Sequence, residues 1–281
     1  MRTTIHKLKS YAKINLGLNI ISKNKSTNLH NIESLVSLID LFDEIYINEI
    51  NSKKHKVLFI GKFSKAIPKI NTVSKLLILL DKRRLLKKKY KLIIKKNIPQ
   101  KSGMGGGSMN AATILNFFKK QKILTKSQSE NFAKKIGSDV ILGLSKLPKV
   151  YHANGKIVEI KNKIKYSLLL VKPKFGCTTK KVFSVNDVFS KKEYSNIKRN
   201  IDKKLIVKSK NDLEYAAIKL YPKLKWLKNE LLDWKKAEFV RMTGSGSTFV
   251  MYFNSNLSAK NALKFLKRKL NNHWCILSKV I

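Results

Sequence analysis

The amino-acid sequence predicts an α+β protein with two fused lobes. The chain has 281 residues, of which 43% are hydrophobic, so it has enough material to bury a sizeable core. Candidate strands and helices interleave irregularly, and no internal repeat is visible. No linker rich in Pro, Gly or Ser marks a boundary. The order of the elements therefore suggests domains over residues 1–160 and 161–281.

In the first half of the chain, the spacing of apolar side chains predicts both strands and helices. The expected strands cover residues 5–22, 34–50 (a hairpin or an edge strand) and 91–95, and the expected helices cover 71–86 and 108–120. A further helix is expected from Ser127, because Glu130 follows it at the spacing of a capping box. Gly137 is placed to end that helix.

The second half contains the same mixture of elements. The expected strands cover residues 167–171, 237–242, 247–253 and 274–280, and the expected helices cover 212–220, 224–236 and 258–270. Ser258 is the candidate N-cap of the last helix.

The chain carries a large positive charge, with 60 Lys and Arg residues against 17 Asp and Glu residues and a formal net charge of +43. Such a charge raises the possibility of nucleic-acid binding. The lysines, however, are spread along the whole chain and accompany many Ile and Asn residues, as an AT-rich coding bias would produce. The charge is better interpreted as that bias together with attraction of anionic substrates.

Several other classes are excluded by simple patterns. No apolar run approaches the roughly 18 residues of a membrane-spanning helix. The N-terminal segment is interrupted by Lys7, Lys9 and Lys13, so it lacks the apolar region of a signal peptide. With only Cys177 and Cys275, neither a disulfide framework nor a CxxC metal site is possible. We therefore expect a soluble, cytoplasmic protein.

The most informative segment is the glycine-rich loop from Pro99 to Asn110, which follows a predicted strand and opens a predicted helix. Four of the five residues from Gly103 to Gly107 are glycine. Glycines let backbone amides approach an anion closely, and a helix N-terminus adds partial positive charge, so a di- or triphosphate would fit. The loop is neither a Walker A motif nor a dinucleotide-binding fingerprint. A flexible turn before a helix is the alternative.

Three further features carry weaker signals. A second glycine loop from Met242 to Thr248 lies between two predicted strands and, taken alone, fits a plain hairpin turn. Lys13 and Asn15 share one face of an apolar strand, where each needs a partner or a ligand unless the strand is an edge. Asp139 lies beside a glycine turn in an acid-poor chain, and an N-cap role explains it equally well.

Taken in order, these motifs resemble the GHMP small-molecule kinase superfamily. They read AKIN, NLH, IPQKSGMGGGSMNAA, GSDV, NDLE and MTGSGS, and they span about residues 11 to 250. The GGGS-x-NAA form of the loop and the NDLE motif from Asn211 to Glu214 are similar to one branch of that superfamily. Its members serve the non-mevalonate route of isoprenoid biosynthesis and phosphorylate a methylerythritol linked to cytidine diphosphate.

The resemblance implies a two-lobed fold with the active site in the cleft between the lobes. The N-terminal lobe would be similar to a ribosomal-protein fold, and the C-terminal lobe would be ferredoxin-like. The implied reaction is ATP-dependent phosphorylation of the 2-hydroxyl of the cytidine diphosphate-linked methylerythritol. Mg²⁺ would bridge the phosphates of ATP with few protein ligands, and no metal-binding residue is assigned. The protein would be a monomer or a homodimer, with no membrane partner.

The resemblance also assigns roles to individual residues. Asp139 matches the catalytic aspartate and Lys13 matches its partner. The positions implied near the nucleotide are Asn71, Lys96, Pro99, Gly103, Met104, Gly105, Gly106, Gly107, Ser108 and Asn110. The positions implied near the acceptor are Asn15, His30, Phe183, Gly244, Ser245 and Gly246, with His30 and Phe183 at the cytosine end.

Three positions depart from the family pattern. Leu29 stands where an aromatic residue, mostly Tyr, usually precedes the histidine; Met109 replaces the second serine of the glycine loop; and Ile141 replaces a proline. Because of Leu29, an acceptor of the homoserine, mevalonate or sugar type stays open. An RNA-binding role also stays open because of the charge, although the chain has no aromatic-rich motif of the RRM type.

Overall fold

The computed structural model describes residues 4–26 and 29–281, so Asn28 of the NLH motif lies outside the described residues. The chain divides into two compact units. The first unit contains Met1–Lys13, Leu41–Gln100 and Gly105–Lys146, and the second contains Ile14–Asp40, Lys101–Met104 and Leu147–Ile281. Two long strands, β1 (His6–Lys23) and β2 (His30–Ile50), therefore contribute residues to both units. A boundary at residue 160 stays a prediction.

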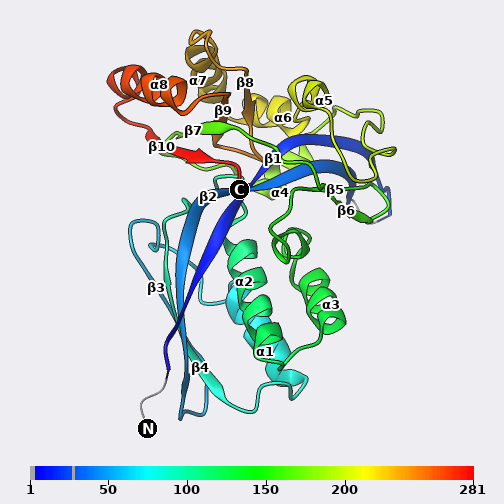
Figure 1. Cartoon of the computed structure of the whole chain (residues 1–281), viewed down its shortest axis with the longest axis vertical. Coiled ribbons are helices and arrows are strands. Elements are labelled where there is room, and N and C mark those ends of the chain that lie inside the picture. The colour runs from blue at the N-terminus through cyan, green and yellow to red at the C-terminus, as the bar shows by residue number, and fades with distance from the viewer. Residues whose placement is uncertain (1–3, 27–28) are drawn as a thin grey trace. The chain divides into compact units, whose positions relative to one another are not determined.

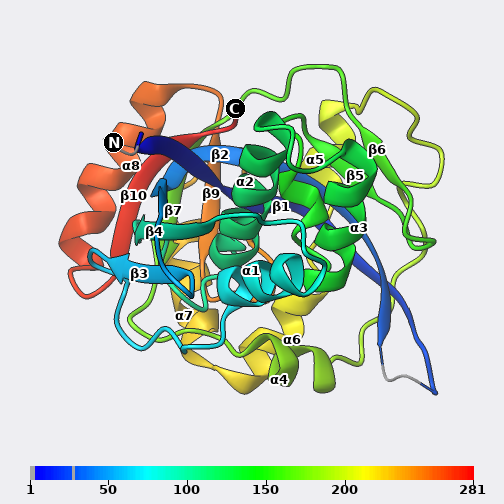
Figure 2. The ribbon, with the colours of Figure 1, turned by 90° about the horizontal axis from the view of Figure 1, so that it is seen from below.

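In the first unit, three helices lie on one side of a group of strands (Figures 1 and 2). The second half of β2 pairs antiparallel with β4 (Lys89–Lys95), which pairs in parallel with β3 (Lys56–Ile60). The helices are α1 (Thr72–Lys82), α2 (Gly106–Lys120) and α3 (Lys126–Ile136), and a short 3-10 turn follows at Ile141–Gly143. Alternate residues of β2 and β4 pack against apolar faces of these helices, which forms a core of this unit.

The second unit is built on a four-stranded antiparallel sheet in the order β10-β7-β9-β8. Its strands are β7 (Ser167–Lys172), β8 (Phe239–Met242), β9 (Phe249–Phe253) and β10 (Trp274–Lys279). Its helices are α4 (Thr179–Ser184), α5 (Lys203–Lys208), α6 (Leu213–Leu220), α7 (Lys223–Leu232) and α8 (Asn256–Lys269). The short strand β5 (Lys149–Tyr151) pairs with the first part of β2 and with β6 (Ile157–Glu159).

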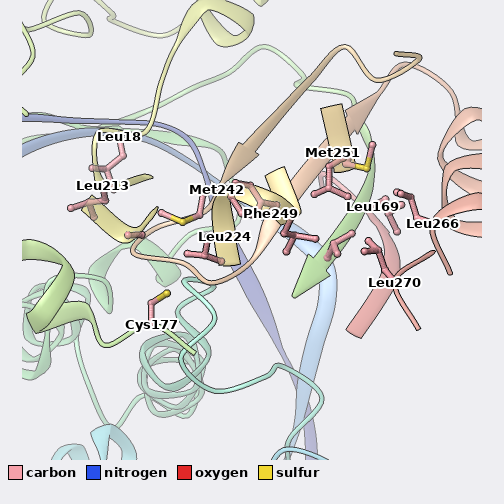
Figure 3. Close-up of a cluster of buried hydrophobic side chains, with 14 of the residues drawn as sticks. Leu18, Leu169, Cys177, Leu213, Leu224, Met242, Phe249, Met251, Leu266 and Leu270 are labelled. Atoms are coloured by element: carbon pink, nitrogen blue, oxygen red, sulfur yellow. The ribbon is translucent and has the colours of Figure 1, made fainter. Parts of the chain in front are cut away.

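The core of the second unit lies between this sheet and its helices (Figure 3). Leu169 of β7 and Phe249 and Met251 of β9 are fully buried against apolar residues of α6, α7 and α8. The intervening residues Leu168 and Val250 are fully buried too. Because successive side chains of a strand point to opposite faces, the sheet is covered on both sides.

The predicted α+β class is confirmed, and each long predicted element is present. The prediction of a hairpin or an edge strand over residues 34–50 is wrong, because β2 is one continuous strand that lies between β4 and β5 in the sheet order. Two acidic residues within β2 have partners: Asp43 is buried and accepts hydrogen bonds, and Glu44 pairs with Lys7 and Lys95. The predicted 71–86 helix ends earlier, at Lys82.

Two predicted helix N-caps are also wrong. The helix α3 is capped by Thr125, whose side chain accepts from the amide of Gln128 while the Gln128 side chain accepts from the amide of Thr125. The helix α8 is capped by Ser255, which accepts from the amide of Ser258. In both places a Ser or Thr two or three residues earlier in the chain satisfies the free amides of the first turn.

The cap assignment on α3 predicts different effects for two neighbouring substitutions. Thr125→Ala should lower the free energy of unfolding by about 0.5–2 kcal/mol, because it removes the acceptor for the Gln128 amide. Ser127→Ala should change it by less than about 0.5 kcal/mol, since this exposed side chain does not cap the helix. Urea unfolding measures both values, and a larger loss for Ser127→Ala than for Thr125→Ala would contradict the assignment.

Candidate active site

A buried carboxylate holds the turn between β4 and the glycine-rich loop in the first unit. Asp43 is fully buried on β2, and its Oδ1 accepts hydrogen bonds from the amides of Asn97 and Ile98 at 2.8 and 2.9 Å. Its Oδ2 forms an ion pair with Nζ of Lys96, whose side chain is only 5% exposed. Three hydrogen-bond donors in residues 96–98 therefore fix the segment just before the glycines to the side chain of Asp43.

The helix α2 begins inside the glycine-rich loop without a side-chain cap. Its N-cap is Gly105, which has a left-handed backbone with φ of 66°. A Cβ atom on Gly105 would lie 3.0 Å from Cγ of Lys13, and one on Gly106 would lie 3.2 Å from Nζ of Lys96. The first amides of α2 are thus flanked by two lysines, and this combination favours a polyanion such as a triphosphate.

Asp139 lies beside this helix start. Its Oδ2 is 3.5 Å from Nζ of Lys13, and Cβ of an alanine at Gly105 would be 3.7 Å from the same oxygen. The Lys13 side chain is 5% exposed, whereas that of Asp139 is 38% exposed, so the carboxylate can meet a ligand from solvent. The N-cap interpretation of Asp139 is wrong, because the 3-10 turn that follows has Val140 as its cap and no side-chain capping bond.

Other predicted nucleotide-side residues take structural positions in the same unit. Asn71 is the N-cap of α1: its Oδ1 accepts from the amides of Val73 and Ser74. Asn110 is buried on α2, and its Oδ1 has no hydrogen-bond partner among the residues that the structure describes. Pro99 is buried ahead of the loop, while Gly107 and Ser108 form the first turn of α2.

In the second unit, the NDLE motif holds the second glycine loop. Nδ2 of Asn211 donates to the carbonyls of Met242 and Gly244, both at 2.8 Å, and Oε2 of Glu214 accepts from the amide of Met242 at 2.9 Å. These bonds tie the N-terminus of α6 to the loop. The plain hairpin interpretation is therefore insufficient, since buried side chains from another element support this turn.

The same loop contacts further predicted residues of this unit. The amide of Asn15 donates to Oγ1 of Thr243 at 3.1 Å, and the Asn15 side chain donates to Oγ of Ser34 at 2.7 Å. A Cβ atom on Gly103 would lie 1.9 Å from the carbonyl oxygen of Thr243, so only glycine fits there. Oγ of Ser245 and Oγ1 of Thr179 are 2.9 Å apart. Met104 is fully buried, and Gly246 belongs to the same turn.

His30 and Phe183 form a pair of rings in the second unit. Their centroids are 5.3 Å apart, with an angle of 48° between the planes. Burial, together with the charge of Lys23, lowers the pKa of His30 from its ordinary value of 6.5. Nε2 of His30 is buried and makes no hydrogen bond within the described part of the chain. Leu29 beside it is 69% exposed.

Comparison with known proteins assigns the chain to a family. The model for the GHMP kinase N-terminal domain matches residues 71–146, and the model for the GHMP kinase C-terminal domain matches residues 198–272. A curated relative from Pelagibacter ubique, named 4-diphosphocytidyl-2-C-methyl-D-erythritol kinase, is 51% identical over 98% of this chain and 99% of the relative. The chain belongs to the 4-diphosphocytidyl-2-C-methyl-D-erythritol kinase family of GHMP kinases. The resemblance predicted from the motifs is thus confirmed.

Other comparisons agree with this family. A relative from Fusobacterium nucleatum with the same name is 31% identical over the full length of both chains. A crystal structure of 4-(cytidine 5′-diphospho)-2C-methyl-D-erythritol kinase covers 98% of this chain and 100% of its own, with a TM-score of 0.77 and 19% identity. A homoserine kinase from Cytophaga hutchinsonii, at 15% identity and a TM-score of 0.68, shares the fold and covers 100% of this chain and 96% of its own. The predicted two-lobed GHMP kinase fold is confirmed, and the protein is an ATP-dependent small-molecule kinase.

Two features of this GHMP kinase concern metals and membranes. Across residues 4–26 and 29–281, no three or more His, Cys, Asp or Glu side chains lie close enough together to hold a metal ion. Within the same residues, no helix is long and apolar enough to cross a membrane.

Sequence reasoning missed the residues that support the two glycine loops. Asp43 was visible only as an acidic residue in an apolar strand, and Asn211 and Glu214 were noted only as part of a motif. An acidic residue within an apolar strand is a usable sequence signal in a chain with only 17 acidic residues, because a carboxylate that becomes buried requires several donors. Met109, which departs from the family pattern, is 2% exposed and packs against the 3-10 turn at Gly143.

The geometry of the loop predicts opposite effects for two glycine substitutions. Gly105→Ala should lower the free energy of unfolding by about 1–2 kcal/mol or more, because alanine is strained at positive φ and its Cβ would crowd Lys13. Gly107→Ala should leave it unchanged or raise it by up to about 1 kcal/mol, since Gly107 lies in the helix and its Cβ would meet only Oγ1 of Thr72 at 3.4 Å. Thermal or urea unfolding measures both, and equal losses would contradict this geometry.

Proposed function

We propose that this GHMP kinase transfers the γ-phosphoryl group of ATP to the 2-hydroxyl of 4-diphosphocytidyl-2-C-methyl-D-erythritol. The observation that carries the proposal is the contact of Lys13 with Asp139 at the start of α2, in a chain that is 51% identical to a curated kinase named for that acceptor. We further propose that the residues assigned in the sequence analysis perform the roles described below.

The proposed reaction is one in-line displacement. The carboxylate of Asp139 accepts the proton of the acceptor hydroxyl, and the resulting oxygen forms a bond to the γ-phosphorus. The bond between that phosphorus and the oxygen bridging to the β-phosphate breaks, and ADP leaves with the electron pair. The ammonium group of Lys13 stabilises negative charge on the attacking oxygen.

The glycine-rich loop is proposed to hold ATP. The free amides of α2 from Gly106 onward and the ammonium group of Lys96 face the same helix start, so they would bind the β- and γ-phosphates. A Cβ atom at Gly105 would crowd Lys13, and one at Gly106 would crowd Lys96, so a side chain there would disturb the proposed phosphate site. Bound Mg²⁺ would neutralise charge on the phosphates, and it would require few protein ligands.

His30 and Phe183 are proposed to bind the cytosine of the acceptor. A buried imidazole nitrogen without a hydrogen-bond partner is costly, by about 1–3 kcal/mol, and a ligand that supplies the partner removes that cost. Phe183 offers a ring face next to His30. Asn15 is proposed to contact the erythritol part, and residues Gly244 to Gly246 to contact the acceptor through the backbone.

Cellular location and assembly are also proposed here. We propose a cytoplasmic enzyme that acts as a monomer or a homodimer and does not recognise nucleic acid. The spread of lysines along the whole chain supports the last point. The charge of +43 would instead favour capture of two polyanionic substrates.

The assigned roles predict a large loss of turnover for one carboxylate substitution. Asp139→Asn should lower kcat by about 10²–10⁴-fold, because the amide cannot accept the proton. Asp187→Asn is the control, since Asp187 is an exposed aspartate whose nearest cation, Lys219, is 3.4 Å away and also exposed. ADP release with ATP, Mg²⁺ and the cytidyl acceptor measures both. A kcat of Asp139→Asn within threefold of the wild type would refute the role of Asp139.

The choice of acceptor can be tested with a panel. ADP release with the cytidyl acceptor should exceed release with homoserine or mevalonate by at least about 100-fold in kcat/KM, because only the first offers a base to His30 and Phe183. Homoserine is the alternative to include, since Leu29 provides no ring beside His30. Comparable turnover of homoserine would retain the kinase class but reject the proposed acceptor.

A further inference from the structure

Arg241 carries a guanidinium group into the interior of the second unit. It lies on β8, just before the second glycine loop, and is only 5% exposed. In the described part of the chain, no acidic side chain forms an ion pair with it. Burial lowers the pKa of Arg241 from its usual value. Because a guanidinium is a donor without acceptor atoms, a buried one must find several oxygen atoms around it.

Three backbone carbonyls accept hydrogen bonds from this guanidinium. Nη1 donates to the carbonyl of Leu16 on β1 and, at 3.1 Å, to that of Ile206 on α5. Nη2 donates to the carbonyl of Val207 at 3.1 Å. The last carbonyls of a helix have no partner within the helix, so Arg241 satisfies the end of α5. Its Cζ also lies 4.5 Å from the centroid of the Phe239 ring. One side chain therefore joins β1, the end of α5 and β8.

The three joined segments carry residues that are proposed to contact the acceptor or that support such residues. On β1, the amide of Asn15 donates to Oγ1 of Thr243 at 3.1 Å. After α5, the side chain of Asn211 donates to the carbonyl of Gly244 at 2.8 Å. The strand β8 leads directly into the loop that contains Thr243 and Gly244. Arg241 thus holds both Asn15 and the second glycine loop through the backbone.

We infer that Arg241 is a positioning residue for the acceptor, because it sets the distance between Asn15 and the second glycine loop. Its guanidinium is buried and donates to backbone carbonyls, so it acts through these segments and does not contact the acceptor. The start of α2 and Lys96, which are proposed to hold ATP, belong to the first unit. A change at Arg241 should therefore affect acceptor binding more than ATP binding. This inference rests on the proposed function, which names the acceptor.

Arg241→Lys tests the inference, because lysine retains the charge but lacks the planar fork that reaches several carbonyls. In the ADP-release assay, the KM for the acceptor should rise by about fivefold or more, whereas the KM for ATP should stay within about twofold. Hydrogen exchange gives a readout that needs no acceptor. The amides of Leu18 and Asp212, which join β1 to the residues after α5, should exchange at least about tenfold faster relative to those of β7.

Leu266→Ala is the matched control for a general loss of stability. Leu266 is fully buried on α8 in the same core, and Figure 3 shows it at the opposite end of that core from Leu18. Its truncation leaves a cavity and lowers stability without removing a contact of Arg241. Both KM values and the exchange ratio should therefore stay within about twofold of the wild type. A general loss of stability would instead produce the same changes in both variants.

An acceptor KM within about twofold of the wild type in folded Arg241→Lys, or an equal rise in the KM for ATP, would overturn the inference. The same changes in Leu266→Ala would also overturn it. If Arg241→Lys does not fold, Phe239→Leu replaces it, since this variant removes the ring beside the guanidinium. The acceptor KM of Phe239→Leu should rise about threefold, and an unchanged value would count against the inference. Failure of the wild-type enzyme to use the cytidyl acceptor would reject the proposed function, whereas unchanged exchange in Arg241→Lys would reject the positioning role alone.

Discussion

The arrangement of the glycine-rich loop depends on the buried carboxylate of Asp43. A charged group that is fully buried is destabilising by several kcal/mol unless donors surround it, and here three donors do so. Two are backbone amides just before the glycine-rich loop, and the third is the ammonium of Lys96. Because Asp43 belongs to β2 and the donors follow β4, this interaction fixes the position from which the loop starts. The location of the free amides of α2, and of the lysines beside them, depends on where the loop starts.

The same use of buried acids recurs in the second unit. Only 17 acidic residues oppose 60 basic ones, yet Glu33, Asp212 and Glu214 are all at most 9% exposed. Each accepts backbone amides from residues distant in sequence: Glu33 those of residues 193 and 194, Asp212 that of residue 20, and Glu214 that of residue 242. In a chain with surplus lysine, these acids are therefore placed where backbone amides need acceptors, and Glu214 supports the glycine loop that contains Gly244 and Gly246.

Much of this organisation could be predicted from the sequence, and the rest could not for identifiable reasons. Long periodic segments such as α2 were predicted, and so was the glycine-rich loop with Lys13 and Asp139, since local pattern and motif order carry that information. The continuity of β2 was missed, because the partners of its acidic residues are distant in sequence. Short elements such as β5 and α5 have too few residues for a periodic signal. The hydrogen bond from the amide of Ser190 to the carbonyl of Ile20 joins residues far apart in sequence, and no local pattern reveals it.

A double-mutant cycle on Asp43 and Lys96 tests most directly whether this buried pair supports the loop. The free energy of unfolding would be measured for Asp43→Asn, for Lys96→Met and for both together. Each single variant should lose about 3–5 kcal/mol, because it leaves a buried charge without its partner. The double variant should lose less than the sum of the two by about 1–3 kcal/mol. Losses that add to within about 0.5 kcal/mol would show that the two side chains act independently, and they would contradict this account.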